Sequence, residues 1–498
     1  RLFNMKRFLI TTLLVSVLSA QVYEGYMLYT PSGINTTYYK DWEGNTINSW
    51  SHSNGPASMP YLLPSDDGGV ENSLLYYPCR ANNPTMESGG VGGKVIIYNW
   101  DGDVLYTYNV SNNNFQHHHD IAVLPNGNFI LVAWERLYSS VWQDLGRTSV
   151  NNNLNQMWAT TFIEVQPILD GRTESYDDSD DSEVVWTWSI KDHLVQDISP
   201  NYSSTYGEIS DHPELFNVNE GNVGSSGGPG GNGNADWIHV NALDYNADLD
   251  QLVFSSRFMS EIYIIDHSTT TEEAASHSGG NSGKGGDFLY RWGNPSNYER
   301  GNNSDNILAD QHSVNWIPEG YPGAGNLILF NNFHSGNNSA VLEFETPIQA
   351  DGSYEIVGSN PYGPDSYSWI YGPSSSISTQ MQGGAFRLPN GNTFITDCDD
   401  ATIIEVRPTG QVVYTYEYPS NNSTIARASK YAPEFFDSAF TLGDINGDGT
   451  LNILDVVSLV NIILSADSSS PASDMNEDGV TNVLDVILLI NTIIGVDG

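Results

Sequence analysis

"LPNGN" at residues 124–128 recurs unchanged at 388–392 and in altered form as "IPEG" at 317–320. Each copy follows one β-rich run and precedes another, and its glycine supplies the positive φ that tight hairpins need. We therefore place each copy at the hairpin between two consecutive strands. The recurrence indicates that one β unit is repeated along the chain.

A short aromatic strand closes each repeat between residues 24 and 418. The six aromatic strands are Asn48–Trp50, Tyr106–Tyr108, Trp186–Trp188, Tyr290–Trp292, Trp369–Tyr371 and Tyr414–Tyr416. Long amphipathic helical patterns are absent from this region, which favours an all-β fold. Six repeats of about 45 to 70 residues predict a six-bladed β-propeller with four-stranded blades over residues 21–420. A solenoid and a pair of β-sandwiches are the alternatives.

The composition narrows the class of protein. The chain has 498 residues and a formal net charge of −42, which repels nucleic-acid phosphates and anionic membrane surfaces. Residues 5–20 have the basic start, short apolar run and small-residue end of a secretory signal peptide. No later apolar run is long enough to span a bilayer, so we expect an exported, soluble protein, periplasmic, cell-surface or extracellular. Cys79 and Cys398 either form a disulfide or remain two buried thiols.

Three histidines share one position of the repeat. His119 and His312 lie five residues before Leu124 and Ile317, and His239 lies five residues before Asp244, the position that we assign to the hairpin of "HVNALDYNADLDQ". This position begins the innermost strand of a blade, which lines the central channel of a propeller. We therefore expect the three imidazoles to meet.

Two kinds of chemistry suit three converging imidazoles: binding a transition metal, and acting on an anion. The sequence "FSSR" brings Arg257 to the rim near His239. A fixed guanidinium disfavours a cation but offers a planar set of donors to an oxyanion, so we favour the anion. Asp120, Asp236 and Asp310 are candidates to orient the imidazoles. His117 and His118 lie outside the repeat position, and we interpret them as structural.

Four separated segments resemble the signature segments of the bacterial arylsulfate sulfotransferases. They are "HHD" at 118–120, "DWIHVNALDYN" at 236–246, "SSR" at 255–257 and "DQHSVNWIP" at 310–318. The resemblance implies an exported six-bladed propeller that moves a sulfuryl group from an aryl sulfate to a phenolic acceptor without a nucleotide cofactor. It also implies that His312 becomes transiently sulfated and that His119, His239, Asn241 and Arg257 surround the sulfuryl group.

The chemistry of sulfuryl transfer explains these residue types. His239 or His119 can protonate the leaving phenolate and later deprotonate the acceptor, because histidine titrates near neutrality. Arg257 and Asn241 would hold the sulfuryl oxygens where charge develops. Two other classes stay open: a non-catalytic binding or scaffold propeller, and a metal-dependent oxidoreductase or hydrolase. Glycine-rich insertions at 221–234 and 278–286 predict flexible loops between blades.

A second unit follows a linker at 421–441. "DINGDGTLNILD" at 444–455 is repeated as "DMNEDGVTNVLD" at 474–485, and each copy has the spacing of a calcium-binding loop that runs into a helix. The predicted Ca²⁺ ligands are Asp444, Asn446, Asp448, Thr450, Asn452 and Asp455, and in the second loop Asp474, Asn476, Asp478, Val480, Asn482 and Asp485.

Residues 442–498 therefore resemble a type I dockerin, a small α-helical domain with paired calcium loops that folds on calcium and docks to a cohesin. Positions 10 and 11 of the two loops are Ile453-Leu454 and Val483-Leu484, which are more apolar than in cellulosomal dockerins. The expected partner is a cohesin-like or cell-surface protein, and docking onto the propeller itself is the alternative.

Overall fold

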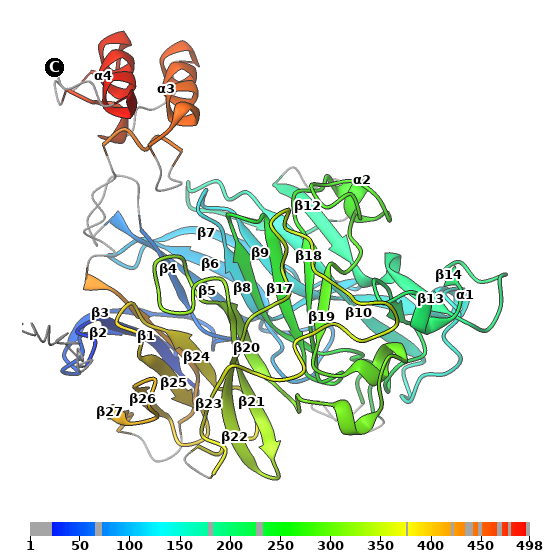
Figure 1. Ribbon diagram of the computed structural model, residues 1–498. Coiled ribbons are helices and arrows are strands. Elements are labelled where there is room, and N and C mark those ends of the chain that lie inside the picture. The colour runs from blue at the N-terminus through cyan, green and yellow to red at the C-terminus, as the bar shows by residue number, and fades with distance from the viewer. Residues whose placement is uncertain are drawn as a thin grey trace, which may run out of the picture.

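The computed structural model describes residues 22–64, 72–177, 183–225, 233–374, 377–419, 423–433, 442–446, 451–465, 471–476 and 480–494. The predicted signal peptide at 5–20 lies outside the described residues. The described part is mostly β and forms six blades, and two helices follow at the C-terminal end (Figure 1). The predicted all-β propeller with a small helical domain is confirmed.

The blades follow one another along the chain. The first contains β28 (Ile425–Tyr431), β1 (Tyr26–Pro31), β2 (Thr36–Lys40) and β3 (Thr46–Ser51). The second contains β4 (Tyr61–Leu63), β5 (Leu74–Arg80), β6 (Gly93–Tyr98) and β7 (Val104–Asn109), with β11 (Arg172–Ser175) added in parallel at its outer edge. The third contains β8 (Phe115–Val123), β9 (Phe129–Tyr138), β10 (Gln156–Val165) and β12 (Val184–Ser189).

The other three blades have the same antiparallel order from the channel outward. The fourth contains β16 (Val240–Asn246), β17 (Gln251–Ser256), β18 (Glu261–Asp266) and β19 (Tyr290–Trp292). The fifth contains β20 (His312–Trp316), β21 (Leu327–Ser335), β22 (Asn338–Phe344) and β23 (Trp369–Tyr371). The sixth contains β24 (Gly384–Arg387), β25 (Thr393–Asp397), β26 (Thr402–Val406) and β27 (Val412–Glu417).

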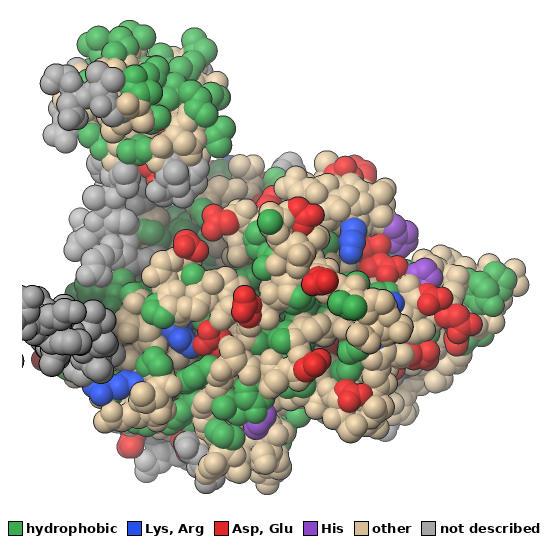
Figure 2. All heavy atoms as spheres, in the orientation of Figure 1, with side chains coloured by type: hydrophobic (Ala, Val, Ile, Leu, Met, Phe, Trp, Pro, Cys, Tyr) green, Lys and Arg blue, Asp and Glu red, His purple; other side chains and the backbone are tan. Residues whose placement is uncertain are grey.

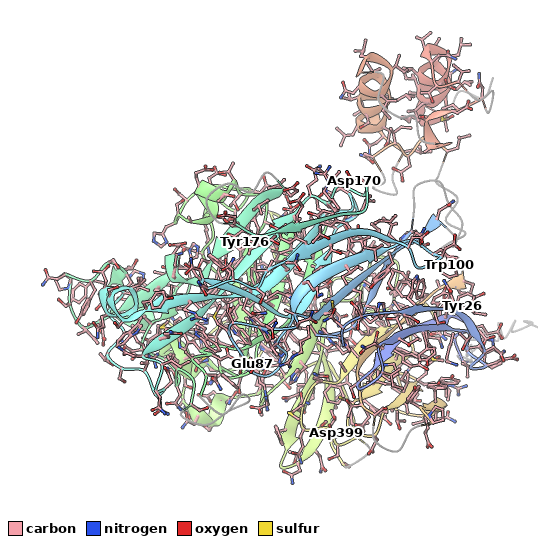
Figure 3. All side chains as sticks on the ribbon, turned by 180° about the vertical axis from the view of Figure 1, so that it is seen from behind. Tyr26, Glu87, Trp100, Asp170, Tyr176 and Asp399 are labelled. Carbon is pink, nitrogen blue, oxygen red and sulfur yellow. The ribbon has the colours of Figure 1, made fainter. Side chains whose placement is uncertain are left out.

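Smaller elements lie between the strands of the blades. They are a sheet of β13 (Leu194–Gln196), β14 (Thr205–Tyr206) and β15 (Phe216–Asn217), the helices α1 (Ser139–Asp144) and α2 (Thr271–Ala274), and the 3-10 turns Ile190–Asp192, Ile209–Asp211, Pro295–Tyr298 and Asn303–Asp305. A further 3-10 turn, Pro471–Ser473, lies in the C-terminal region. Tyr176, labelled in Figure 3, directly follows β11. Its ring packs edge-on against Phe115 of the third blade, with centroids 4.9 Å apart. The added strand therefore links the second blade to the third.

Each predicted aromatic strand lies within the fourth strand of a blade counted from the channel, namely β3, β7, β12, β19, β23 or β27, and in the second blade β11 is added outside β7. Their rings fill the space between neighbouring strands and blades. Trp292 stacks on Phe344 of the next blade at 3.9 Å, and Trp50 meets Trp100 edge-on at 5.3 Å. Large buried aromatic surfaces give each blade its apolar contact with the next.

The predicted hairpins at 124–128 and 388–392 join the first and second strands of the third and sixth blades, and the turn that begins at 317 does so in the fifth. The fourth blade differs from the prediction. Asp244 lies inside β16, and the hairpin comes three residues later, at 247–250, because β16 stays paired with β17 as far as Asn246. His239 nevertheless lies directly before β16.

The ring is closed by β28, which pairs antiparallel with β1. Residues 425–431 therefore provide the innermost strand of the first blade. The boundary predicted at residue 420, with a linker over 421–441, was wrong at this point. The sequence signal was weak because the closing strand follows the sixth repeat and is far in the chain from the other strands of its blade.

The glycine-rich segment 278–286 lies inside the fourth blade, between β18 and β19, and not between blades as predicted. Its backbone is tied down by hydrogen bonds from Gly285 N to Gly279 O (3.0 Å) and from Gly286 N to Ser276 O (3.1 Å). The segment therefore forms a folded loop with defined contacts.

Cys79 and Cys398 are both free and buried, so the thiol alternative holds. Burial raises the pKa of each thiol to about 12, which keeps both protonated. Among the described residues, no helix has the length and apolar character needed to cross a membrane.

Helices α3 (Ile453–Ser465) and α4 (Val483–Ile494) form a separate small core around Val456, Leu459 and Leu489. Figure 1 shows the pair side by side at the C-terminal end of the chain. Each helix follows one of the two acidic loops, as the duplicated sequence predicts.

The position of β28 predicts the outcome of two truncations. A chain that ends at Ser420 lacks β28, so the first blade loses its innermost strand and the ring stays open. A chain that ends at Pro433 keeps the closing strand. We expect the shorter chain to melt about 10 °C or more below the longer one, measured by thermal unfolding of both. Equal melting temperatures would contradict closure by β28.

Candidate functional site

The three predicted histidines come together at the channel. His119 lies in β8, His239 precedes β16, and His312 begins β20. The rings of His119 and His239 meet edge to face, with centroids 4.7 Å apart. His119 and His312 line the same small buried cavity, together with Asn241 and Arg427. The convergence predicted from the repeat position is therefore observed.

Hydrogen bonds fix the tautomer of His312. Its Nδ1 lies 2.7 Å from Oδ1 of Asn332, whose amide nitrogen donates to the carbonyls of Thr379 and Gln382. Oδ1 must therefore accept, so Nδ1 of His312 carries the hydrogen. The lone pair on Nε2 accepts the backbone N–H of Gln382 at 3.2 Å.

Burial lowers the pKa of His312 to about 3, and the nearby charge of Arg257 acts in the same direction against the hydrogen bond to Asn332. The imidazole is therefore neutral at pH 7. A neutral imidazole with a defined Nε2 lone pair has the form that a nitrogen nucleophile requires.

His239 has a carboxylate partner. Its Nδ1 lies 2.5 Å from Oδ2 of Asp236, and the other oxygen of Asp236 accepts the indole N–H of Trp134 at 3.0 Å. This pairing places a hydrogen on Nδ1 and leaves Nε2 for the channel. The ring also stacks on Phe258, at a centroid distance of 4.6 Å. A histidine held in this way can give and take a proton at Nε2.

His119 is held by its neighbours along β8. Its Nδ1 lies 2.9 Å from Nδ1 of His118, which stacks on Trp134 at 4.0 Å. Burial lowers the pKa of His118 and His119 well below the usual range. His117 accepts the N–H of Gly93 at 3.0 Å, so it satisfies a loop backbone, as predicted for a structural histidine.

Two consecutive glycines, Gly89 and Gly90, lie against the rings of His239 and His119. The carbonyl of Gly90 accepts the N–H of His119 at 2.7 Å. A Cβ at Gly90 would lie 2.0 Å from Nε2 of His119, and a Cβ at Gly89 would lie 3.3 Å from Cε1 of His239. The loop approaches the imidazoles this closely only because it has no side chains there.

Arg257 and Asn241 lie at the same end of the channel. The guanidinium of Arg257 donates through Nε and Nη2 to one oxygen of Asp310, at 3.1 and 2.8 Å, and its side chain is 21% exposed. Its backbone N–H donates to the carbonyl of His239. Asn241 donates to the carbonyl of Gln311, and its Oδ1 is buried without a hydrogen bond among the described residues.

Arg427 is a site residue that the sequence did not reveal. It lies on β28, is buried, and donates to Oδ2 of Asp120 at 2.8 Å and to the hydroxyl of Ser58 at 2.7 Å. Its segment was assigned to the linker, so no repeat position pointed to it. A basic residue in an otherwise acidic chain, shortly after the sixth aromatic strand, was the available signal.

The three aspartates that were predicted to orient the imidazoles have different roles. Asp236 orients an imidazole, as predicted. Asp120 instead holds Arg427 and accepts the hydroxyl of Tyr61 at 2.6 Å, and Asp310 holds Arg257. The guanidinium of Arg427 and the neutral imidazoles of His119 and His312 thus line the cavity, and the charge of Arg257 acts on His312. This arrangement favours an anion over a cation.

The C-terminal loops repeat one hydrogen-bond pattern. Asp455 accepts the backbone N–H groups of Asn446 and Asn452 at 3.2 and 2.8 Å. Asp485 accepts those of Asn476 and Asn482 at 3.3 and 2.7 Å. Asp444, Asp474 and Val480 are the other described ligand candidates, whereas Asp448, Thr450 and Asp478 lie outside the described residues. In both loops the last carboxylate ties the loop to the start of its helix.

Apolar side chains gather over the two C-terminal helices and their loops (Figure 2). The exposed ones include both residues at loop positions 10 and 11, and the set is Ile453, Leu454, Val457, Leu464, Val480, Val483, Leu484, Ile487, Leu488, Ile490 and Ile494. An exposed apolar surface of this kind on a small domain favours an interaction with another protein.

The sequence matches two family models. Residues 176–349 match the arylsulfotransferase (ASST) family, and residues 442–494 match the type I dockerin domain. The first match contains His239, Asn241, Arg257 and His312. The chain thus combines an arylsulfotransferase domain, within a six-bladed propeller, with a type I dockerin domain, as the resemblances predict.

Solved structures with a similar fold have low sequence identity. A protein of unknown function from Bacteroides caccae is 11% identical, with a TM-score of 0.39, over 82% of this chain and 98% of that one. The periplasmic gluconolactonase PpgL of Pseudomonas aeruginosa is 13% identical, with a TM-score of 0.34, over 82% and 99%. Apo AztD from Citrobacter koseri is 9% identical, with a TM-score of 0.32, over 82% and 99%. At these values the similarities carry no functional argument.

No curated protein matches the sequence. The family matches support a sulfotransferase that carries a calcium-binding dockerin domain. Dockerin domains occur on extracellular and cell-surface proteins, and they point to a cohesin as the partner.

The contact between Gly90 and His119 predicts the effect of a single methyl group. Gly90→Ala adds a Cβ at φ +70°, directly against Nε2 of His119. We expect a loss of about 1–2 kcal/mol of stability from the left-handed backbone and about 1–3 kcal/mol more from the clash, measured by denaturant unfolding.

Gly33→Ala is the matched control, because Gly33 has φ +74° and open space around its Cβ position. This variant should lose only the stability that the left-handed backbone costs, because its new methyl group meets no other atom. Equal losses of stability in the two variants would show that the glycine loop does not constrain His119.

Calcium binding by the tail is the next prediction. Calorimetric titration of the full chain with Ca²⁺ should show two sites, because each loop supplies its own set of oxygen ligands. Asp455→Asn should remove one site, and the double variant with Asp485→Asn should remove both. Asp351→Asn, in an exposed turn of the propeller, should retain two. Retention of both sites by the double variant would contradict the ligand assignment.

Proposed function

We propose that the protein is an arylsulfate sulfotransferase that transfers a sulfuryl group through a sulfated His312, without a nucleotide cofactor. The observation that carries the proposal is the state of His312. Its Nδ1–H is engaged by Asn332, its pKa is lowered to about 3, and its side chain lines a cavity together with Arg427, with the charge of Arg257 nearby.

In the first half-reaction, the hydrogen bond from the backbone N–H of Gln382 to Nε2 of His312 opens, and the freed lone pair attacks the sulfur of an aryl sulfate. An N–S bond forms as the S–O bond to the phenolate breaks, and the phenolate oxygen receives a proton from Nε2 of His239. Asp236 stabilises the imidazolium form of His239 before that proton leaves. The phenol departs, and the sulfuryl group remains on His312.

In the second half-reaction, His239 takes the proton of the acceptor phenol while the phenol oxygen attacks the same sulfur. The N–S bond breaks, the new aryl sulfate leaves, and both histidines return to their starting states. Two displacements at one nitrogen give ping-pong kinetics.

The charged groups stabilise the sulfuryl oxygens. Arg257 and Arg427 offer guanidinium N–H donors from two sides of the cavity, and Asn241 adds a neutral amide. Fixed donors in a buried site act strongly where negative charge develops. His119, neutral and held by His118, would position a sulfuryl oxygen through Nε2.

The dockerin domain determines where the enzyme is located and takes no part in the reaction. An exported enzyme, periplasmic, cell-surface or extracellular, would be held by its calcium-loaded dockerin domain to a cohesin-like or cell-surface partner. The apolar residues at loop positions 10 and 11 would form the contact, since they are exposed in both copies.

The covalent intermediate predicts the behaviour of His312→Asn. With 4-nitrophenyl sulfate as donor and phenol as acceptor, the unsubstituted protein should release nitrophenolate and gain about 80 Da on one peptide after alkaline quench. His312→Asn should lose the adduct and at least about 10³-fold in turnover. Arg257→Lys should keep the adduct but slow its formation, because the planar set of donors is lost.

His334→Asn serves as the control, since His334 lies on β21 outside the cavity and should keep full activity. An adduct on His239 or His119 would keep the reaction but overturn the assignment of His312 as the nucleophile. Full activity of His312→Asn would contradict covalent transfer. Inactivity of the unsubstituted protein would favour a propeller that only binds.

A further inference from the structure

A second histidine cluster lies away from the channel. His193 follows the outer strand β12 of the third blade, whereas His277 and Asp287 stand at the two ends of the glycine-rich loop of the fourth blade. One ligand atom from each residue lies within 4.8 Å of the other two. His193 and Asp287 are buried, and the side chain of His277 is 52% exposed.

The hydrogen bonds of His193 do not suit a neutral imidazole. Nε2 lies 2.8 Å from the carbonyl oxygen of Ala274, and Nδ1 lies 2.8 Å from Oδ1 of Asp287. Both partners are acceptors, but a neutral imidazole has only one N–H. A proton or a metal cation bound at Nδ1 removes the conflict, and in either case Nε2–H donates to the carbonyl, as in most metal-bound histidines.

The same carboxylate oxygen meets a second imidazole. Nδ1 of His277 lies 2.7 Å from Oδ1 of Asp287. Two imidazole nitrogens and one carboxylate oxygen are a donor set that suits zinc and neighbouring divalent transition metals. We propose that His193, His277 and Asp287 form a zinc-type metal site with a fourth position open to solvent beside His277.

The ligands can reach the required spacing. With metal–ligand bonds of about 2.0–2.1 Å, tetrahedral ligand atoms lie about 3.3 Å apart, so the N–O separations must open by about half an ångström. His277 can make that movement because it is half exposed. His193 is fixed by parallel stacking on Trp188, at a centroid distance of 5.4 Å, and by its bond to Ala274.

The loop is shaped to bring its two ends to His193. A Cβ at Gly286 would lie 2.6 Å from Nε2 of His193, so the residue before Asp287 must be small. The carbonyl of Gly286 also accepts the indole N–H of Trp188 at 2.8 Å. A bound ion would join the third and fourth blades, which carry His119 and His239, and would stabilise their outer loops.

The test uses the full chain in excess Ca²⁺, which saturates the dockerin loops. After removal of transition metals with a chelator, Zn²⁺ is titrated calorimetrically and Co²⁺ by visible absorption. We expect one Zn²⁺ per chain, the d–d bands of a four-coordinate Co²⁺, and a higher melting temperature. His277→Gln and Asp287→Asn should each weaken Zn²⁺ binding at least about tenfold.

His212→Gln is the matched control, because His212 makes a similar contact with Glu214 at 3.0 Å and is 30% exposed. It should bind Zn²⁺ as the unsubstituted protein does. Absence of Zn²⁺ binding, or binding that neither ligand variant weakens, would overturn the proposal. Loss of the ion in His119→Asn alone would assign it to the channel and would overturn the proposal equally.

Discussion

The pairing of β28 with β1 is the constraint on which the rest of the structure depends. A propeller blade has an edge on each side, and a ring of blades is stable only when the first and last are joined. Here one strand from the end of the domain completes the first blade. The same strand places Arg427 in the cavity with His119 and His312, so the strand that closes the ring also completes the site.

The site presents guanidinium and N–H donors inside a strongly negative protein. The chain has a net charge of −42, while the cavity is lined by Arg427 and by two imidazoles that burial keeps neutral, with Arg257 close to His312. Asp120 and Asp310 each hold one arginine in place, so an anion entering the cavity meets donors that are already oriented. Orientation before binding is what makes electrostatic stabilisation effective in a buried site.

The sequence predicted most of the fold because its signals repeat. Aromatic outer strands recur in every blade and glycine hairpins in several, and the repeat position of His119, His239 and His312 followed from them. The closing strand does not repeat a neighbour, and Arg427 was therefore assigned to a linker. Asp120 and Asp236 look alike in sequence, as acids close to a histidine, but only tertiary contacts decide that one binds a guanidinium and the other an imidazole.

A left-handed residue at or beside each of the three channel histidines turns their side chains toward the axis. His119 and His239 have φ values of +53° and +52°, and Ser313, beside His312, has +58°. The pairing register shifts at each of these places, between His117 and Ile121, Val240 and Ala242, and His312 and Asn315. β-Bulges re-aim side chains in this way.

Such left-handed residues cost roughly 1–2 kcal/mol each, and the surrounding blades must compensate for the strain. Gln382, at the entry to the sixth blade, has φ +64°, and its N–H donates to Nε2 of His312. Left-handed non-glycine residues thus stand at the repeat position in the third and fourth blades, and one residue after or before it in the fifth and sixth. Strain repeated at the entries of four consecutive blades, where three imidazoles converge, is accounted for by the geometry of the site and not by the folding of any single blade.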